Sequence, residues 1–307
     1  MRERLPAGDP IACPVCDSGP DRHRFLFKKQ GVDFRACLTC RFEFVNPRPT
    51  EEWLKARYEY YGEHLFLDEH RLQTDFQAAR FDVEWSVLQG LSGALLDVGC
   101  STGAFVRLAR NSGFDAQGID LSERAVSYGR DHLSLPLRAG DFTAGMFAEA
   151  SFDVVTLWAT LEHLPDPGAF LAEASRVARP GGALLISVPN HRSLTQRILG
   201  PRNRYVGVDH LNYFSGRTLR TLVASHGFSP TLLVTRKVNP FLIYQDWRGK
   251  GAVGASVDQV IRDQSVTDAV KNGRLLAPMR AVHAAAERFL GRLGLGDLLL
   301  LRATKRT

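Results

Sequence analysis

Four of the five cysteines in this 307-residue chain lie before residue 41, as two Cys-x-x-Cys pairs. They are Cys13 with Cys16 and Cys37 with Cys40, and twenty residues separate the pairs. Four thiolates on two such knuckles have the ligand number and spacing of a structural, tetrahedral zinc site. Two disulfides would need an oxidising compartment, and a redox site would need only one pair. The spacing predicts a zinc ribbon.

A second set of reactive side chains follows short apolar runs. Asp97 lies in "LLDVGCSTGAF" and Asp120 in "GID". The turn after Asp97 contains Gly99 and Gly103, and we expect a turn so poor in side chains to let the backbone approach a ligand closely. The Asp97 carboxylate can accept hydrogen bonds from a ligand's ammonium group or from loop amides. An acidic residue about twenty positions later, such as Asp120, is typical of a site that binds ribose hydroxyls.

Asp141 in "AGDF" ends a third apolar run. Its carboxylate could accept from an adenine amine, with Phe142 beside the ring. Each aspartate could instead be only a helix cap. A dinucleotide site is a competing interpretation, but it prefers G-x-G-x-x-G, whereas this turn reads G-x-x-x-G.

The elements that must position these residues begin at residue 93. Apolar runs such as "ALLDVG", "FDVVTLW" and "ALLISVPN" alternate with helical stretches such as "FVRLARNSG" and "GAFLAEASRVARPGG". This rhythm predicts a doubly wound α/β sheet whose ligand lies beyond the carboxyl ends of parallel strands. "SPTLLVTRK" and "DLLLLRATK" predict two further strands.

Together these motifs resemble the class I S-adenosylmethionine-dependent methyltransferases, over residues 93–237 plus the C-terminal strand. The resemblance implies a seven-stranded Rossmann-like sheet and the cofactor S-adenosyl-L-methionine. It implies that Asp97, Gly99 and Gly103 border the methionine part, that Asp120 holds the ribose, and that Asp141 and Phe142 frame the adenine. Ser101 replaces a glycine common in the family. The further cofactor contacts that we predict are Cys100, Ser101, Leu121 and Trp158.

"WATLEHLPDP" resembles the stretch at the active-site mouth of quinone, sugar and natural-product methyltransferases, with Glu162 and His163 there. Quinone O-methyltransferases have a metal-binding glutamate three residues before that pair, where this chain has Ala159, so we expect no metal assistance. "VDHLNYFS" resembles a loop that overhangs the transferred methyl group, which makes His210 and Tyr213 candidates. A histidine of ordinary pKa can remove an acceptor's proton at neutral pH. A structural role is the alternative for each of these residues.

The predicted organisation is a zinc ribbon at 1–48, linking helices at 49–92 and the methyltransferase domain at 93–307, with an inserted helical segment at about 240–296. One linking helix is expected after Thr50, and another at about 74–90. The basic, amphipathic residues 275–296 predict a helix packed on the domain; a membrane-surface contact, a lid and a dimer contact are the alternatives.

The net charge of +6 and the isoelectric point near 9.2 come from scattered arginines, which favours an ordinary basic surface over a nucleic-acid stripe. No apolar run reaches the roughly 18 residues of a membrane span, and no secretion leader is apparent, so we expect a cytoplasmic protein. The leading hypothesis is O- or C-methylation of a sugar, glycan precursor or secondary metabolite. The alternatives are RNA methylation, with the ribbon docked on RNA, and a non-catalytic binding module.

Overall fold

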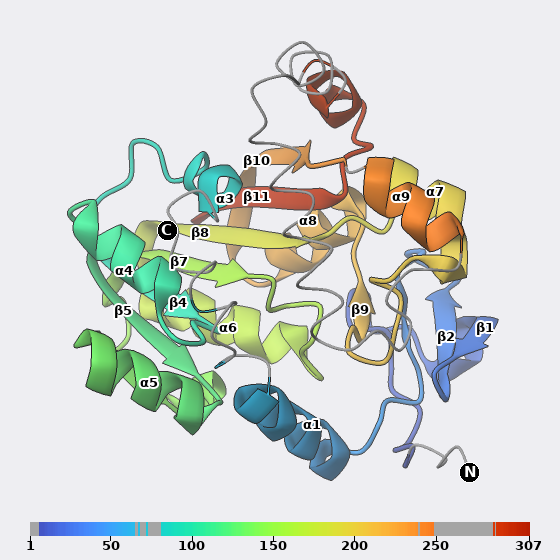
Figure 1. The fold of residues 1–307 in the computed structure, drawn as a ribbon, viewed down its shortest axis with the longest axis horizontal. Coiled ribbons are helices and arrows are strands. Elements are labelled where there is room, and N and C mark those ends of the chain that lie inside the picture. The colour runs from blue at the N-terminus through green and yellow to red at the C-terminus, as the bar shows by residue number, and fades with distance from the viewer. Residues whose placement is uncertain are drawn as a thin grey trace.

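The computed structural model describes residues 6–64, 67, 72, 81–238, 240–248, 285 and 287–307. Two sheets organise them (Figure 1). The larger sheet has seven strands in the order β10-β11-β8-β7-β4-β5-β6, and the smaller has four in the order β1-β2-β3-β9. The predicted seven-stranded fold is therefore confirmed.

The parallel strands of the larger sheet end at one common edge. Its parallel members are β4 (Ala94–Val98), β5 (Asp115–Asp120), β6 (Leu137–Ala139), β7 (Phe152–Trp158) and β8 (Ala178–Pro189). Strand β11 (Leu298–Lys305) lies between β8 and β10 (Phe228–Arg236) and runs antiparallel to both. Since parallel strands carry their carboxyl ends to the same side, the residues that follow β4, β5 and β7 meet there.

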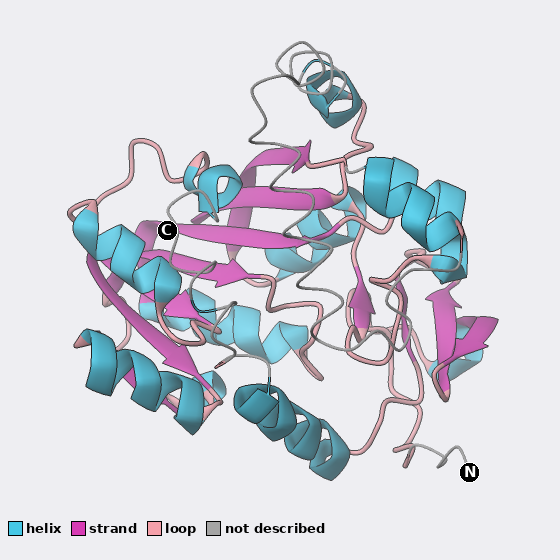
Figure 2. Ribbon diagram, viewed as in Figure 1, coloured by secondary structure: helices cyan, strands magenta, loops and turns pink. Residues whose placement is uncertain are grey.

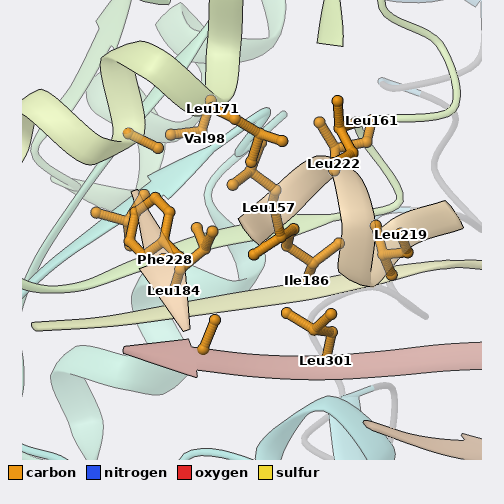
Figure 3. Close-up of a cluster of buried hydrophobic side chains, with 14 of the residues drawn as sticks. Val98, Leu157, Leu161, Leu171, Leu184, Ile186, Leu219, Leu222, Phe228 and Leu301 are labelled. Carbon is orange, nitrogen blue, oxygen red and sulfur yellow. The ribbon is translucent and has the colours of Figure 1, made fainter. Parts of the chain in front are cut away.

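Helices cover both faces of this sheet (Figure 2). The cluster on one face takes residues from α6 (Pro167–Val177) and α8 (Gly216–Ser225), and the cluster on the other takes residues from α4 (Ala104–Asn111) and α5 (Glu123–Leu133). Adjacent strand residues divide between the faces: Leu95 belongs to the α4–α5 cluster and Leu96 to the α6–α8 cluster. Figure 3 shows the α6–α8 cluster, in which strand side chains meet Leu171 and Leu222. Burial on both faces explains the unbroken apolar runs of these strands.

Side-chain caps begin three of these helices. Ser122 accepts a hydrogen bond from the Ala125 amide at α5, and Asp166 accepts one from Ala169 at α6, where proline follows at the first helical position. Ser215 forms a capping box with Thr218 at α8. The cap at Ser215 fixes where the preceding segment ends, and that segment carries His210.

The smaller sheet joins the N-terminal segment to a strand from the larger domain. It contains the hairpin of β1 (His23–Lys29) and β2 (Val32–Cys37), then β3 (Glu43–Val45), and finally β9 (Asn212–Tyr213) from the larger domain. Two short strands therefore connect the two cysteine pairs. His23 at the start of β1 is 8% exposed, and its Nε2 lies 3.0 Å from the Ser18 carbonyl oxygen.

The linking region is partly described. Helix α1 (Glu51–His64) begins after Thr50, whose hydroxyl accepts from the Trp53 amide at 3.4 Å. The second predicted helix survives as α3 (Asp82–Trp85), and its residues 74–80 lie outside the described part of the chain. The remaining short helices are η1 (Pro20–Arg22), η3 (Phe142–Ala144), α7 (Leu194–Leu199), η4 (Gly200–Arg202) and α9 (Pro240–Trp247).

Most of the predicted insertion, including half of residues 275–296, also lies outside the described residues. Within the described part of the chain, no helix combines the length and the apolar character needed to cross a bilayer. The proposed domain boundaries stay predictions.

Candidate functional site

The four N-terminal cysteines come together as a metal-binding cluster. Cys13 Sγ lies 3.5 Å from Cys40 Sγ, and Cys16 Sγ lies 3.5 Å from Cys37 Sγ. All four sulfurs lie within 4.8 Å of one another. A zinc ion with Zn–S bonds of about 2.3 Å in a tetrahedron needs sulfurs about 3.8 Å apart, so this set fits zinc.

The turn after β4 is left-handed at three positions. The φ angles are +80° at Gly99, +50° at Ser101 and +84° at Gly103. A Cβ on Gly99 would lie 2.6 Å from Thr160 Oγ1, and a Cβ on Gly103 would lie 2.8 Å from Leu135 and Leu137 side chains. Both glycines are thus required by conformation and by close protein packing. The sequence predicted only that they let a ligand approach the backbone.

Two buried carboxyl groups lie at the carboxyl edge of the sheet. Asp97 is 3% exposed and its Oδ1 accepts the Thr156 hydroxyl at 2.7 Å. Asp120 is 4% exposed and accepts the amides of Ser101 and Ser122, at 2.8 and 2.9 Å, so it ties the turn after β4 to the turn after β5. Burial raises the pKa of Asp97 to about 7 and also raises that of Asp120.

Such carboxyl groups suit the predicted cofactor. Neither Asp97 nor Asp120 forms an ion pair with a described residue, and a cationic ligand would relieve the cost of keeping them charged. A carboxylate has about four acceptor sites, so Asp120 keeps acceptor capacity for hydroxyl groups beyond its two amide bonds. The donor and acceptor chemistry of this edge therefore fits an aminoacyl and ribosyl ligand.

The predicted adenine contacts differ from expectation in detail. Asp141 Oδ1 accepts the Thr143 amide and hydroxyl, both at 2.8 Å, so its carboxylate caps η3, which is the alternative that the sequence left open. Phe142 is 2% exposed and packs against Phe147 and Phe170. Its ring belongs to the core, and a stacking contact of this ring with adenine finds no support in the packing.

The remaining predicted cofactor contacts differ in exposure. Leu121, directly after Asp120, is 51% exposed, whereas Cys100 is buried at 5%. Trp158 ends β7 and meets Phe105 edge-on at 5.3 Å between ring centroids. The buried Trp158 Nε1 has no hydrogen-bond partner in the described part of the chain. A buried indole donor without a partner is a site where a ligand acceptor would be stabilised.

Glu162 and His163 follow β7 at the same edge. Glu162 is 2% exposed, its Oε2 has no hydrogen-bond partner among the described residues, and burial raises its pKa while His163 opposes that rise. His163 Nδ1 lies 2.7 Å from the main-chain oxygen of Asp209, which can only accept, so Nδ1 carries the proton. Nε2 is then the basic nitrogen, 3.9 Å from Glu162 Oε1, and the side chain is 36% exposed.

His210 and Tyr213 reach this site from a distant segment. The His210 ring lies edge-on to His163, with centroids 4.7 Å apart, and burial together with His163 lowers the pKa of His210 to about 3. The Tyr213 hydroxyl donates to the Gly207 carbonyl at 2.8 Å and accepts the Gly207 amide at 3.1 Å, and burial raises its pKa. Tyr213 is therefore committed to its own loop, and its predicted catalytic role finds no support.

Ligand atoms of Glu162, His163 and His210 lie within 4.8 Å of one another. Two imidazoles and a carboxylate are a donor set that could also receive a divalent cation. We expected no metal assistance because Ala159 replaces a metal-binding glutamate. That expectation did not consider His210, which is 47 residues from His163 in the sequence but close to it in the structure. That expectation stays a prediction, to be decided by metal analysis.

Sequence reasoning missed the residues that hold the histidines. Arg57 donates to both carboxylate oxygens of Asp209, at 2.8 and 3.2 Å. Arg48, 6% exposed, donates to the Leu164 carbonyl and to Asn212 Oδ1, both at 2.7 Å. The arginines lie more than a hundred residues from these partners in the sequence, and no local spacing signals such pairs.

Residues 84–233 match a family model described as a methyltransferase domain. A ubiquinone biosynthesis O-methyltransferase from Methylococcus capsulatus is 36% identical over 122 residues, which are 38% of this chain and 49% of the relative. A 2-methyl-6-phytyl-1,4-hydroquinone methyltransferase from Synechocystis is 29% identical over 203 residues, which are 61% of this chain and 63% of the relative. The chain thus spans about half to two thirds of the length of these relatives.

Solved structures share the fold at low sequence identity. A SAM-dependent methyltransferase from Archaeoglobus fulgidus superposes with a TM-score of 0.51 at 18% identity, over 81% of this chain and 99% of that one. The [4+2]-cyclase SpnF superposes with a TM-score of 0.53 at 18% identity, over 85% of this chain and 98% of that one. Since a named cyclase shares it, the fold alone does not identify the reaction. Residues 84–233 thus match a methyltransferase-domain family over slightly less than half of the chain, and a cysteine cluster able to hold zinc precedes them.

Proposed function

We propose that this protein transfers a methyl group from S-adenosylmethionine to a small-molecule acceptor, with His163 as the general base. The observation that carries the proposal is the state of His163. Its Nδ1 is committed to the Asp209 carbonyl, and its Nε2 faces the buried Glu162 at the sheet edge that also holds Asp97 and Asp120.

The carboxyl edge would hold the cofactor. When bound, S-adenosylmethionine supplies a methyl group already activated as a sulfonium substituent. Asp97 would accept from the ammonium group and Asp120 from the ribose hydroxyls, while the turn of Gly99 and Gly103 brings main-chain groups to the ligand. Leu121 is exposed next to Asp120 and would cover the adenine. These residues bind and orient the cofactor, and the remaining barrier is the placement and deprotonation of the acceptor.

His163 suits proton removal better than His210 does. The pKa of His210 is about 3. A base with so low a pKa binds a proton too weakly at neutral pH to remove one efficiently from an acceptor. His163 is 36% exposed on its side chain, so an acceptor can reach it, and Glu162 at 3.9 Å would stabilise the imidazolium formed. The proton would pass from the acceptor hydroxyl or acidic carbon to Nε2. His210 then lines the acceptor side, beside His191 and Tyr205 in one shallow pocket.

The relatives' names support a hydroxylated small molecule as acceptor. They describe ubiquinone biosynthesis O-methylation and the methylation of a hydroquinone. The pocket next to His210 includes Asn190 and Ser193, but both side chains bond to main-chain groups of the protein, so this lining does not separate such a molecule from the sugar or glycan precursor predicted from the sequence. We therefore propose a hydroxyl-bearing aromatic or sugar, methylated at oxygen or at an adjacent carbon.

The test is methyl transfer from tritium-labelled S-adenosylmethionine to a panel of catechols, hydroquinones and nucleotide sugars. His163→Gln should lower kcat by about 100- to 10,000-fold with unchanged cofactor affinity, the usual range for loss of a general base. His132→Gln, on the exposed face of α5, is the matched control and should keep full activity. Full activity of His163→Gln, or no transfer to any acceptor by protein that binds the cofactor, would contradict the proposal.

A further inference from the structure

The segment from Gly200 to Phe214, here called the histidine segment, carries His210 and the Asp209 carbonyl that fixes His163. Only η4 and β9 give it regular structure. A segment with few main-chain hydrogen bonds of its own must be held by other elements if its side chains are to keep catalytic geometry. It is held from the methyltransferase side, where the Glu162 carbonyl accepts the Leu211 and Asn212 amides at 2.7 and 3.1 Å, and from the N-terminal part of the chain.

The tip of the β1–β2 hairpin contacts the first half of the histidine segment. Lys29 Nζ donates to the carbonyl oxygens of Pro201 and Asn203, at 2.7 and 3.1 Å. Gln30 Oε1 accepts the Val208 amide at 2.8 Å. Three main-chain groups of the segment are therefore satisfied by two side chains at the tip of the zinc-ribbon hairpin.

The second half is held by strand pairing. Residues of β3 pair with β9, and the Val45 amide donates to the Leu211 carbonyl at 3.0 Å. An apolar cluster fills the interface; its buried members are Val32, Phe34, Val45, Val206, Val208, Leu211 and Tyr213. The β-sheet of the ribbon thus continues into the segment that bears His210.

Arg57 of α1 makes the contact nearest to the base. Its guanidinium binds the Asp209 carboxylate through Nε at 2.8 Å and Nη2 at 3.2 Å. The main-chain oxygen of the same Asp209 accepts His163 Nδ1–H. A bidentate arginine–carboxylate pair fixes orientation as well as distance. Arg57 thus binds the side chain of the residue whose carbonyl oxygen accepts His163 Nδ1–H.

We propose that the zinc ribbon and α1 are the positioning scaffold of the catalytic histidines, with Arg57 as a positioning residue that sets the His163 tautomer. Two parts of the protein would then have separate roles, one in methyl transfer and one in cofactor binding. Loss of zinc or of Arg57 weakens methyl transfer, whereas the cofactor edge at β4 and β5 is built without these contacts and keeps its affinity. This inference rests on the proposed function of His163, but its first test does not need activity.

The first test is nitrogen-15 NMR of the His163 imidazole in the full-length, zinc-loaded protein. We expect the Nδ1–H form in the wild type and a shift toward the Nε2–H form in Arg57→Gln, because the Asp209 carboxylate then loses its arginine and the orientation of the Asp209 carbonyl is less restricted. Arg57→Lys keeps the charge and should restore part of the Nδ1–H population. Arg130→Gln, on the exposed face of α5, is the matched control. An unchanged tautomer in Arg57→Gln would overturn the inference.

The second test separates positioning from binding. Arg57→Gln should lower kcat by about 10- to 100-fold, the effect of a small misplacement of a catalytic group, with the S-adenosylmethionine Kd within about twofold of the wild type. Removal of zinc by a chelator should abolish hydrogen-exchange protection of the histidine segment and leave that Kd within the same limit. Equal loss of cofactor affinity in both cases, or retained protection without zinc, would contradict the scaffold. A protein that binds no cofactor at all would instead refute the proposed function.

Discussion

We expect Asp97 to make the affinity for S-adenosylmethionine depend on pH. Its carboxyl group is 3% exposed at the end of β4, and burial raises its pKa to about 7 in the ligand-free protein. The ionised form binds an ammonium group much more strongly than the neutral acid does, because the hydrogen bond is then charge-assisted. As pH falls below 7, an increasing part of the binding energy is spent on deprotonation, so the apparent Kd rises.

The size of the effect follows from that pKa. With a pKa of about 7, the ionised fraction is about one in eleven at pH 6 and about ten in eleven at pH 8. The Kd should therefore be about tenfold higher at pH 6 than at pH 8, which corresponds to about 1.4 kcal/mol of binding free energy. Isothermal titration at constant ionic strength measures it.

Asp97→Asn separates this effect from the titration of the ligand's own amino group. The variant should bind more weakly at pH 8 and should lose the part of the pH dependence that Asp97 contributes. If the wild type and Asp97→Asn show the same ratio of Kd values between pH 6 and pH 8, Asp97 does not hold the ammonium group, and the assignment of the β4 edge is refuted.

Three further predictions follow from neighbouring features. Gly99→Ala should lower the free energy of unfolding, measured in urea, by about 2–4 kcal/mol, because φ is +80° and the new Cβ would meet Thr160 Oγ1 at 2.6 Å. The control is Gly113→Ala, where φ is +93° but the new Cβ meets no atom, so only the cost of the left-handed backbone should be lost. Asp120→Ala should weaken cofactor binding by roughly 1–3 kcal/mol in calorimetry, and unchanged affinity would remove its ribose assignment. Elemental analysis should find about one zinc per chain, and a metal-free yet stable protein would contradict the ribbon; a second metal lost in His210→Ala would reveal a cation at the histidines.

The sheet was predictable because its signals are local. Apolar runs of strand length, helical spacing between them and the glycine turn after Asp97 are all set within a few residues. The cysteine spacing likewise determines the ligand number of the metal cluster. Even the position of β11 followed once the family resemblance was recognised, since the inserted antiparallel strand belongs to that topology.

The site was predictable only in part, because its decisive contacts are between distant residues. The sequence gives no sign that the Phe142 ring faces the core, or that the Tyr213 hydroxyl bonds to Gly207. The choice between His163 and His210 depends on burial, which lowers the pKa of His210, and on Asp209, which fixes the tautomer of His163. Neither property can be inferred from the spacing of the residues.

One titration tests the central claim most directly. The full-length, zinc-loaded protein, shown to be folded by circular dichroism, is titrated with S-adenosylmethionine at pH 8 in a calorimeter. The buried carboxyl groups of Asp97 and Asp120 beside the left-handed turn predict saturable binding of one molecule per chain, with a roughly micromolar Kd. Absence of binding by the folded protein would contradict the account.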